Sequence, residues 1–345
     1  MIGIVGGGLA AARLVEGYRG AGGTDDIVIW SQDPHGPYHR PPLSKRLLRG
    51  EAEPKDALIA LDGVDLRLGE TVDSLDEVDA DTIVIATGSR PRELDGALHL
   101  RTLDDSLELR RRARESRTAT VIGGGFVGCE VTASLTQLGL QVTQVVREPA
   151  LFAAIACPPL SEALHDSYRA HGVDLRLGET EIPPADLVLA GVGVVPNVEL
   201  ARNAGLEVRT AVVVDERFRT SRDGVYAIGD VAEFYDPLYR RHRHVEHWSN
   251  AAYHGTTLGR ILAGEDARFD IVSSFFSEEF GRTFRTYGDH EGYDATSLDG
   301  DFAGDRALFR FSRAGKTIAA VATGLDDEEQ AGIQDEIRAG AASLA

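Results

Sequence analysis

The feature that most constrains this 345-residue chain is a literal internal repeat: the nine residues GVDLRLGET occur at 63–71 and again at 172–180. An apolar stretch and a glycine-rich turn precede each copy, IGIVGGGLAAARL from Ile2 and TVIGGGFVGCEV from Thr120. An acidic residue, an apolar stretch and a small-residue turn follow each copy, ending at Gly88 and at Gly193. Two parts of the chain therefore share one plan.

Each part reads as strand, glycine turn, helix, strand and later strand, which is the βαβ order of a dinucleotide-binding unit. Such a turn needs small residues where the backbone approaches a pyrophosphate and where the helix packs closely on the strand. The two sets of small residues are Gly6, Gly8 and Ala11, and Gly123, Gly125 and Gly128. The sequence predicts an α/β fold with two Rossmann-like domains.

The residue at the end of each unit's second strand indicates which nucleotide the unit binds, because an acid there binds a ribose hydroxyl. Asp33 follows the stretch IVIW and is the candidate for the first unit. Arg147 follows VTQVV in the second unit, and a guanidinium suits a 2′-phosphate, so NADPH is favoured over NADH. Glu148, one residue further, leaves NADH open.

Charge and cysteine content exclude several other classes. The formal net charge of −19 opposes binding to nucleic acid and to anionic lipid. The sequence has no apolar run near the roughly 18 residues of a membrane span, which favours a cytoplasmic protein. Cys129 and Cys157 lie too far apart for a CxxC pair, and the ten histidines follow no zinc spacing, so we expect no metal site.

Five further segments carry a family resemblance. They are PYHRPPLSK at 37–45, ATGSRP at 86–91, GVGVVPN at 191–197, GVYAIGDVA at 224–232 and VEHWSNAAYHG at 245–255. Together with the glycine turns they resemble the flavoprotein reductases with two dinucleotide-binding domains. The resemblance is greatest to the oxygenase-coupled ferredoxin and rubredoxin reductases, a branch that also includes the apoptosis-inducing factor.

The resemblance implies a discontinuous FAD-binding domain at 1–103 and 218–265. It implies an NAD(P)H-binding domain at 104–217 and a C-terminal α+β domain at 266–345. The residues that it assigns to FAD are Gly6, Gly8, Ala11, Asp33, Arg40, Lys45, Ala86, Thr87, Gly88, Gly229, Asp230, Glu246, His247 and Trp248. The residues that it assigns to NAD(P)H are Gly123, Gly125, Phe126, Val127, Gly128, Arg147, Gly191, Val192 and Gly193.

Lys45 stands out because it is one of only three lysines among 36 basic residues. In the similar reductases the matching lysine lies beside the flavin ring and pairs with a glutamate that matches Glu130. A fixed ammonium there stabilises the negative charge that hydride brings to the ring. Lys45 and Glu130 are therefore the candidate catalytic residues.

The expected activity is electron transfer from NAD(P)H through FAD to a ferredoxin-type iron–sulfur protein, which then serves a cytochrome P450 or a ring-hydroxylating oxygenase. The alternatives are reduction of rubredoxin, a small oxidant or dioxygen, and a redox-dependent interaction protein like the apoptosis-inducing factor. Both a monomer and a homodimer remain open. Five arginines are candidates for docking an acidic carrier: Arg240, Arg241, Arg243, Arg282 and Arg285.

Overall fold

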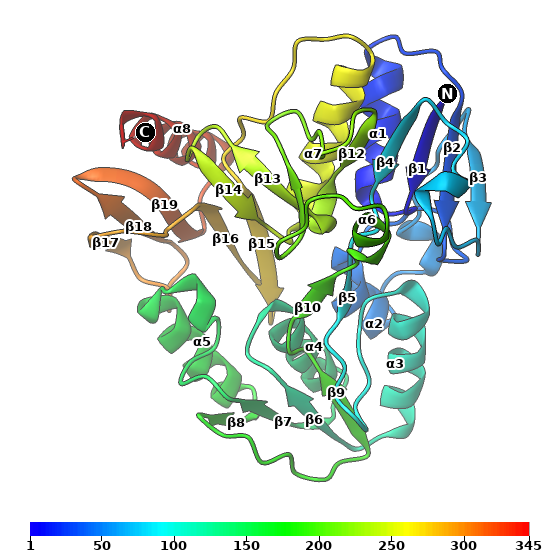
Figure 1. Cartoon of the computed structure of the whole chain (residues 1–345). Helices are drawn as coiled ribbons and strands as arrows, with labels where there is room; N and C mark the ends of the chain where they lie inside the picture. The colour runs from blue at the N-terminus through cyan, green and yellow to red at the C-terminus, as the bar shows by residue number, and fades with distance from the viewer. Residues whose placement is uncertain (345) are drawn as a thin grey trace.

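The computed structural model describes residues 1–344 and divides them among five β-sheets with helices packed between them (Figure 1). Two of the sheets are parallel and a third, at the C-terminal end of the chain, is antiparallel. This arrangement confirms the predicted fold class of two Rossmann-like units and a C-terminal domain. Among these residues, no helix has the length and apolar composition needed to cross a bilayer.

The first parallel sheet has the strand order β12-β4-β1-β2-β3. Its strands are β1 (Ile2–Val5), β2 (Ile27–Ser31), β3 (Asp65–Leu68), β4 (Thr82–Ile85) and β12 (Val225–Ala227). Strands β1, β2 and β4 are buried on both faces and read as continuous apolar runs, as parallel strands do. Strand β12 comes more than a hundred residues after β4, so the chain leaves this sheet and later rejoins it. The domain boundaries themselves stay a prediction.

The second parallel sheet has the order β8-β7-β6-β9. Its strands are β6 (Thr118–Ile122), β7 (Gln141–Val146), β8 (Asp174–Leu177) and β9 (Leu187–Ala190). The helices around it are α3 (Leu103–Glu115), α4 (Phe126–Gln137) and α5 (Pro158–Ala170). The repeated residues DLRL form β3 in one unit and β8 in the other, and both strands lie at the edge of their sheets. The internal repeat is thus a repeat of structure.

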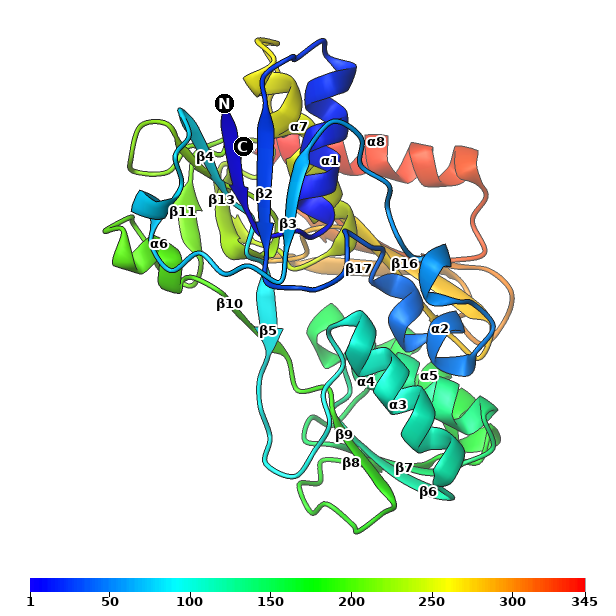
Figure 2. The ribbon, with the colours of Figure 1, turned by 90° about the vertical axis from the view of Figure 1, so that its right-hand side faces the viewer.

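Two short strands connect the parallel sheets. Strand β5 (Ser89–Pro91) leaves the first unit, β10 (Val194–Pro196) returns from the second, and the two pair antiparallel between the units (Figure 2). After β10 the chain forms α6 (Glu199–Asn203) and a small sheet of β11 (Val212–Val214), β13 (Ala232–Asp236) and β14 (Arg241–His244).

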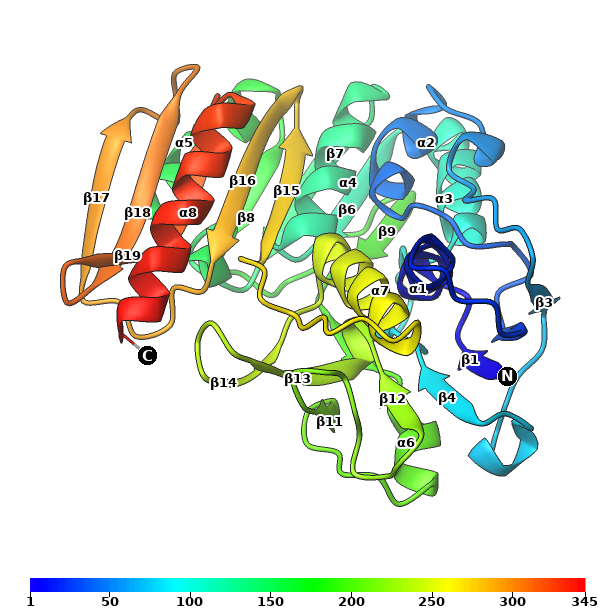
Figure 3. The same ribbon diagram turned by 90° about the horizontal axis from the view of Figure 1, so that it is seen from above.

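The C-terminal sheet has the order β15-β16-β19-β18-β17 and carries helix α8 (Asp327–Leu344) on one face (Figure 3). Its strands are β15 (Ser274–Glu279), β16 (Arg282–Gly288), β17 (Ala295–Gly300), β18 (Ala307–Arg313) and β19 (Lys316–Thr323). Strand β15 lies at the sheet edge next to α4 of the second unit (Figure 3). Side chains of this sheet therefore reach the region between the two parallel sheets.

Helices α1 (Leu9–Gly20) and α7 (Trp248–Leu262) pack side by side against the first sheet (Figure 3). Their backbones approach so closely that a Cβ at Gly255 would lie 2.2 Å from the Ala10 carbonyl oxygen. A Cβ at Gly259 would lie 2.3 Å from the Leu14 carbonyl oxygen. This close contact fixes the start of α7 beside the start of α1.

Replacing Gly259 by Ala should destabilise the fold by about 1–3 kcal/mol, because the added methyl group forces the two helices apart. Gly332→Ala in α8 is the matched control, since a Cβ there meets nothing within 4 Å and the change favours the helix by about 0.5–1 kcal/mol. Urea unfolding of both variants measures the difference. Equal stabilities would contradict the close contact.

Candidate functional site

One large cavity of about 1210 Å³ lies at the carboxyl ends of the strands of the first sheet. Val5, Ser31 and Ala86, at or just beyond the ends of β1, β2 and β4, contribute to its wall. Ligands of open parallel sheets bind at this edge. The cavity also reaches the residues at the start of α4 and α7.

The structure brings nearly all of the predicted FAD residues to this one cavity. Those that line it are Gly6, Gly8, Asp33, Arg40, Lys45, Ala86, Thr87, Gly88, Gly229, Asp230, Glu246, His247 and Trp248. Ala11 lies outside the lining because its methyl group is fully buried inside α1, where it allows close helix packing. Their roles toward a cofactor stay predictions.

The first glycine turn has the geometry that a bound pyrophosphate requires. Gly6 has a φ of +114°, and a Cβ there would lie 2.2 Å from the Ala86 carbonyl oxygen. Gly8 caps α1, and a Cβ there would meet no atom within 4 Å, because this position faces the cavity. Since the first N–H groups of a helix lack partners within the helix, the start of α1 suits an anion that approaches closely. The residues present thus fit the diphosphate of a dinucleotide.

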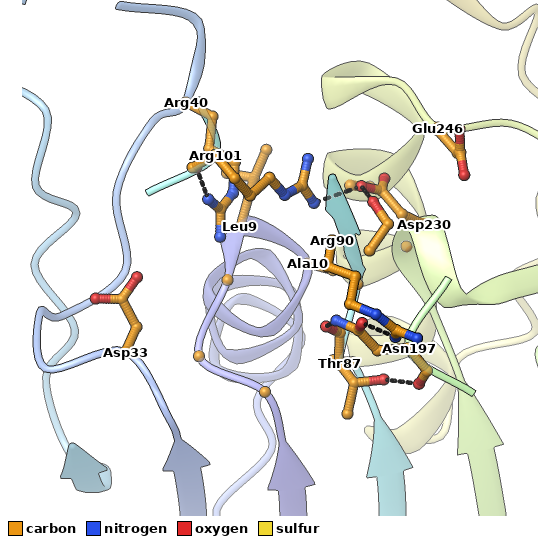
Figure 4. A pocket seen from close by; sticks show the side chains of 18 of the residues that line it. Leu9, Ala10, Asp33, Arg40, Thr87, Arg90, Arg101, Asn197, Asp230 and Glu246 are labelled. Atoms are coloured by element: carbon orange, nitrogen blue, oxygen red, sulfur yellow. Dashed lines mark hydrogen bonds and ion pairs between the residues drawn. The ribbon is translucent and has the colours of Figure 1, made fainter. Parts of the chain in front are cut away.

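Two carboxylates stand on opposite sides of the start of α1 (Figure 4). Asp33 accepts hydrogen bonds from the Tyr38 hydroxyl at 2.7 Å and from the His35 backbone N–H at 3.0 Å. On the far side, Asp230 accepts from Arg101 Nη2 at 2.8 Å and from the Ser89 hydroxyl at 3.1 Å. The cavity therefore offers hydrogen-bonding groups to both ends of an elongated ligand.

The Asp230 carboxylate is held in its charged form. Burial alone would raise the pKa of this group, but the Arg101 and Ser89 hydrogen bonds and the nearby Arg40 charge outweigh burial and lower the pKa. Arg40 itself donates to the Arg101 carbonyl oxygen, so the two guanidinium groups sit together above the start of α1 (Figure 4). This positive cluster suits an anionic ligand.

Lys45 and Glu130 form a buried ion pair at the other end of the cavity. Lys45 Nζ lies 2.6 Å from Glu130 Oε2, and each residue is less than 8% exposed. The Ser44 hydroxyl donates to Glu130 Oε2 at 2.5 Å, and the Ser277 hydroxyl lies 2.7 Å from Glu130 Oε1. The structure thus brings the two predicted catalytic residues together, and their role stays a prediction.

The wall beside this pair is aromatic. The His247 ring stacks on Phe275 with ring centres 4.0 Å apart, and burial lowers the His247 pKa to about 4, so the ring is neutral near pH 7. Trp248 begins α7 and is 39% exposed at the cavity mouth. A flat ring entering the cavity finds both an apolar wall and an ammonium group.

The second glycine turn repeats the geometry of the first. A Cβ at Gly123 would lie 2.3 Å from the Gly191 carbonyl oxygen, and one at Gly128 would lie 2.4 Å from the Gly123 carbonyl oxygen. Gly125 caps α4 and leaves open space, as Gly8 does at α1. Of the predicted NAD(P)H residues, Phe126 and Val127 also line the large cavity. This joins the start of α4 to the site of the first unit.

Arg147 follows β7 and its side chain is 81% exposed, with Nη2 2.8 Å from Glu148 Oε1. The arginine and the acid that the sequence left as alternatives are thus paired with each other. Val192 and Gly193 follow β9, on the same edge of the second sheet as the glycine turn.

One of the proposed docking arginines, Arg243, is buried, so this part of the prediction is wrong. Arg243 is buried and pairs with Asp236 at 2.6 Å and with Asp289 at 2.8 Å. Arg241 pairs with Asp289 and Glu291. Arg243 therefore offers no accessible guanidinium to an approaching protein, whereas Arg241, whose side chain is 36% exposed, stays a candidate.

Sequence reasoning missed three polar residues of the site. The Arg101 guanidinium donates a hydrogen bond to Asp230, but no sequence pattern distinguishes Arg101 from the other arginines of this arginine-rich chain. Ser277 and Glu279 lie on one face of β15 and are both buried. They alternate with half-buried neighbours along the strand, but the segment SFFSEE shows no alternation of polar and apolar residues that could have identified this face. Within residues 1–344, no three His, Cys, Asp or Glu side chains gather as metal ligands would.

Comparison with known proteins supports the interpretation of the cavity as a dinucleotide-binding site. The family model described as pyridine nucleotide-disulphide oxidoreductase matches residues 2–183 and 177–255. Putidaredoxin reductase of Pseudomonas putida is 31% identical, over 87% of this chain and 83% of that protein. The ferredoxin–NAD(+) reductase component of the anthranilate 1,2-dioxygenase system of Burkholderia cepacia is also 31% identical, over 93% of this chain and 90% of that protein.

Solved structures extend the likeness to three dimensions. The reductase in a covalent putidaredoxin reductase–putidaredoxin complex superposes with a TM-score of 0.92 at 29% identity, covering 98% of this chain and 93% of that one. A ferredoxin reductase from Rhodopseudomonas palustris gives a TM-score of 0.90 at 28% identity, covering 96% and 93% of the two chains.

Fold and site together define a flavoprotein of the class with two dinucleotide-binding domains, which uses FAD and NAD(P)H. The chain belongs to the pyridine nucleotide-disulphide oxidoreductase family and, within it, to the ferredoxin and rubredoxin NAD(P) reductases of oxygenase systems. The resemblance seen in the sequence is confirmed. Both cysteines are free and buried, and among the described residues neither lines the large cavity. A disulfide beside the flavin therefore plays no part here.

Replacing Lys45 by Met should destabilise the protein by about 3–5 kcal/mol, because Glu130 is then a buried charge without its cation. Adding Glu130→Leu should recover most of that loss. Lys55→Met is the control, since Lys55 is exposed. Urea unfolding at neutral pH of the wild type, Lys45→Met, Glu130→Leu, the double variant and the Lys55→Met control measures the coupling. Additive single and double effects would contradict a buried pair.

Proposed function

We propose that this protein takes hydride from NAD(P)H onto FAD and passes single electrons to a small ferredoxin-type iron–sulfur protein that serves a cytochrome P450 or a ring-hydroxylating oxygenase. The observation that carries the proposal is the cavity that joins the first glycine turn, Asp33 and Asp230 to the buried Lys45–Glu130 pair. Bound FAD supplies the conversion of a two-electron donor to one-electron delivery.

Different residues of the cavity would bind different parts of FAD. The start of α1 at Gly8 would receive the diphosphate, and Asp33 the adenosine ribose. Asp230 and Arg101 would bind the hydroxyls of the linking chain, since together they offer an acceptor and a donor. Lys45 then holds its ammonium where negative charge develops, without having to reorganise.

The electron donor would enter from the second unit. The second glycine turn is equally open at Gly125, and the next two residues, Phe126 and Val127, line the large cavity. A dinucleotide bound there would reach the wall formed by Glu130, His247 and Trp248. No side chain has to give or take a proton for hydride transfer, so the protein acts through position and charge.

The acceptor is assigned from the relatives, because putidaredoxin reductase has been solved in covalent complex with putidaredoxin. Trp248 and Arg285 line the cavity and are both exposed to solvent, so they would lie close to a flavin ring bound there. We place the docking of the acidic carrier there, since short distance and opposite charge both favour electron transfer.

The two glycine turns provide the test of this assignment. Gly8→Val should yield a colourless protein, because the side chain fills the diphosphate cradle. Gly125→Val should keep the yellow FAD but lose at least about tenfold in kcat/KM for NAD(P)H. The wild type should reduce cytochrome c rapidly only when a ferredoxin is added.

Absorbance of the purified variants and steady-state rates measure these outcomes. A fully loaded yellow Gly8→Val protein would contradict the first cradle as the FAD site. Wild-type turnover that needs no carrier protein would contradict the ferredoxin assignment.

We further propose that Arg147 makes NADPH the preferred donor. The guanidinium is exposed at the end of β7, where the 2′-phosphate of a nucleotide on the second turn would lie. Its pairing with Glu148 limits the preference, and several relatives are named as NAD(+) reductases.

Arg147→Glu should therefore shift the ratio of kcat/KM for NADPH over NADH at least about tenfold toward NADH. Glu148→Gln, which frees the guanidinium, should shift the same ratio toward NADPH. Steady-state kinetics with both donors measure the ratios. If the ratio is unchanged in both variants, Arg147 does not determine the preference between NADPH and NADH.

A further inference from the structure

A single serine hydroxyl bridges two buried carboxyl groups. Ser277 Oγ lies 2.7 Å from Glu130 Oε1 and 2.6 Å from Glu279 Oε1. A hydroxyl carries one hydrogen and can donate it to only one of the two carboxyl groups. The other contact is a hydrogen bond only if that carboxyl group is itself protonated and donates to the serine oxygen. The geometry therefore requires one proton shared between Glu130 and Glu279.

Glu279 is the carboxyl group that holds this proton at rest. Glu130 has the Lys45 ammonium at 2.6 Å and the Ser44 hydroxyl at 2.5 Å, both on Oε2, which stabilise its charge. Glu279 is 2% exposed, has no ion-pair partner among the described residues, and its Oε2 makes no hydrogen bond there. The protonated Glu279 donates to Ser277, and Ser277 donates to Glu130.

The two ends of this chain of hydrogen bonds face different spaces. Lys45 and Glu130 line the large cavity, whereas Glu279 lines a second cavity of about 20 Å³. That volume accommodates about one water molecule. The half-buried Ser167 of α5 and Arg282 of β16 also line the small cavity. Ser277 is thus the link between the proposed flavin site and a separate small space between α5 and the C-terminal sheet, whose wall is mostly apolar but includes Glu279, Ser167 and Arg282.

The proposed reaction releases a proton that such a link can carry. NAD(P)H and two oxidised one-electron acceptors give NAD(P)⁺, two reduced acceptors and one H⁺. Hydride would bring two electrons and this proton to bound FAD together, but only the electrons would go to the iron–sulfur protein. The proton therefore leaves separately from the electrons.

We propose that Lys45, Glu130, Ser277 and Glu279 form a proton relay that connects the flavin site to the small cavity. Glu279 releases its proton to water in the small cavity. Ser277 then passes its hydrogen to Glu279 and takes a proton from Glu130. Glu130 takes one from Lys45, and Lys45 would regain its proton from the cofactor as the electrons leave. Each bond to hydrogen that breaks is replaced by one that forms, and the net change is one proton moved outward. This inference rests on the proposed flavin site.

The surroundings of Glu279 support its protonated state. Burial raises its pKa well above the ordinary range, the Glu130 charge raises it further, and Ser277 and Lys45 offset only part of this rise. The other titratable or charged groups that face it are the Cys129 thiol of α4, the Tyr168 hydroxyl of α5 and Arg282 of β16. Glu278, its half-buried neighbour on β15, has the smallest effect on its pKa.

Glu279→Gln and Ser277→Ala test the relay, with Glu278→Gln as the matched control. Glu278 lies on the same strand but lines neither cavity. Flavin reduction by NAD(P)H should change less than about twofold, since hydride brings its own proton. Reoxidation of the reduced flavin by ferricyanide should slow about tenfold or more in both relay variants, with a larger solvent isotope effect. Stopped-flow absorbance measures both steps.

Two readouts need no flavin. The infrared band of a protonated carboxylic acid should be present in the wild type and in Glu278→Gln and absent from Glu279→Gln. Because the folded protein keeps a proton that the unfolded chain releases, wild-type stability should fall relative to Glu279→Gln as the pH rises from about 5 to about 8.

Unchanged reoxidation in both relay variants, with FAD bound, would overturn the relay. A carboxylic band that persists in Glu279→Gln would overturn the assignment of the proton to Glu279. Absence of FAD from the wild type would instead overturn the proposed flavin site, and the infrared and stability measurements would still decide where the proton resides.

Discussion

The buried carboxylate of Glu130 is the point at which three parts of the chain meet. It belongs to α4 of the second unit, is bound by Ser44 and Lys45 of the first unit, and contacts Ser277 of the C-terminal sheet. A buried charge is tolerated only when its partners are in place. Glu130 therefore fixes how the two parallel sheets and the edge strand β15 sit around the large cavity.

Duplication explains the architecture, and small differences separate the two copies. Both units use a glycine-capped helix after the first strand and the same DLRL edge strand. In the first unit the turn opens into the large cavity, whereas in the second only the start of α4 reaches it. A ligand bound at the first glycine turn would lie inside the cavity, and a ligand bound at the second turn would reach it from outside. This arrangement suits a permanently bound flavin and an exchanging nucleotide.

How much could be predicted from the sequence depended on how local each signal was. The glycine turns follow from short-range backbone geometry, and the repeat placed both of them. The family segments indicated the contact between Lys45 and Glu130, which are 85 residues apart. Arg101, Ser277 and Glu279 were not predicted, because their roles come from tertiary contacts of β15 and of the segment before α3. Burial of Arg243 likewise depends on packing around Asp236 and Asp289, which no pattern of arginines reveals.

The central claim is that the large cavity holds FAD where NAD(P)H can reduce it. The direct measurement is anaerobic titration of the purified, FAD-loaded protein with NADPH, followed by absorbance. The account predicts one FAD per chain, with its visible absorbance bleached by about one equivalent of donor. A protein that stays colourless after incubation with FAD, or bound FAD that neither NADPH nor NADH bleaches, would contradict it.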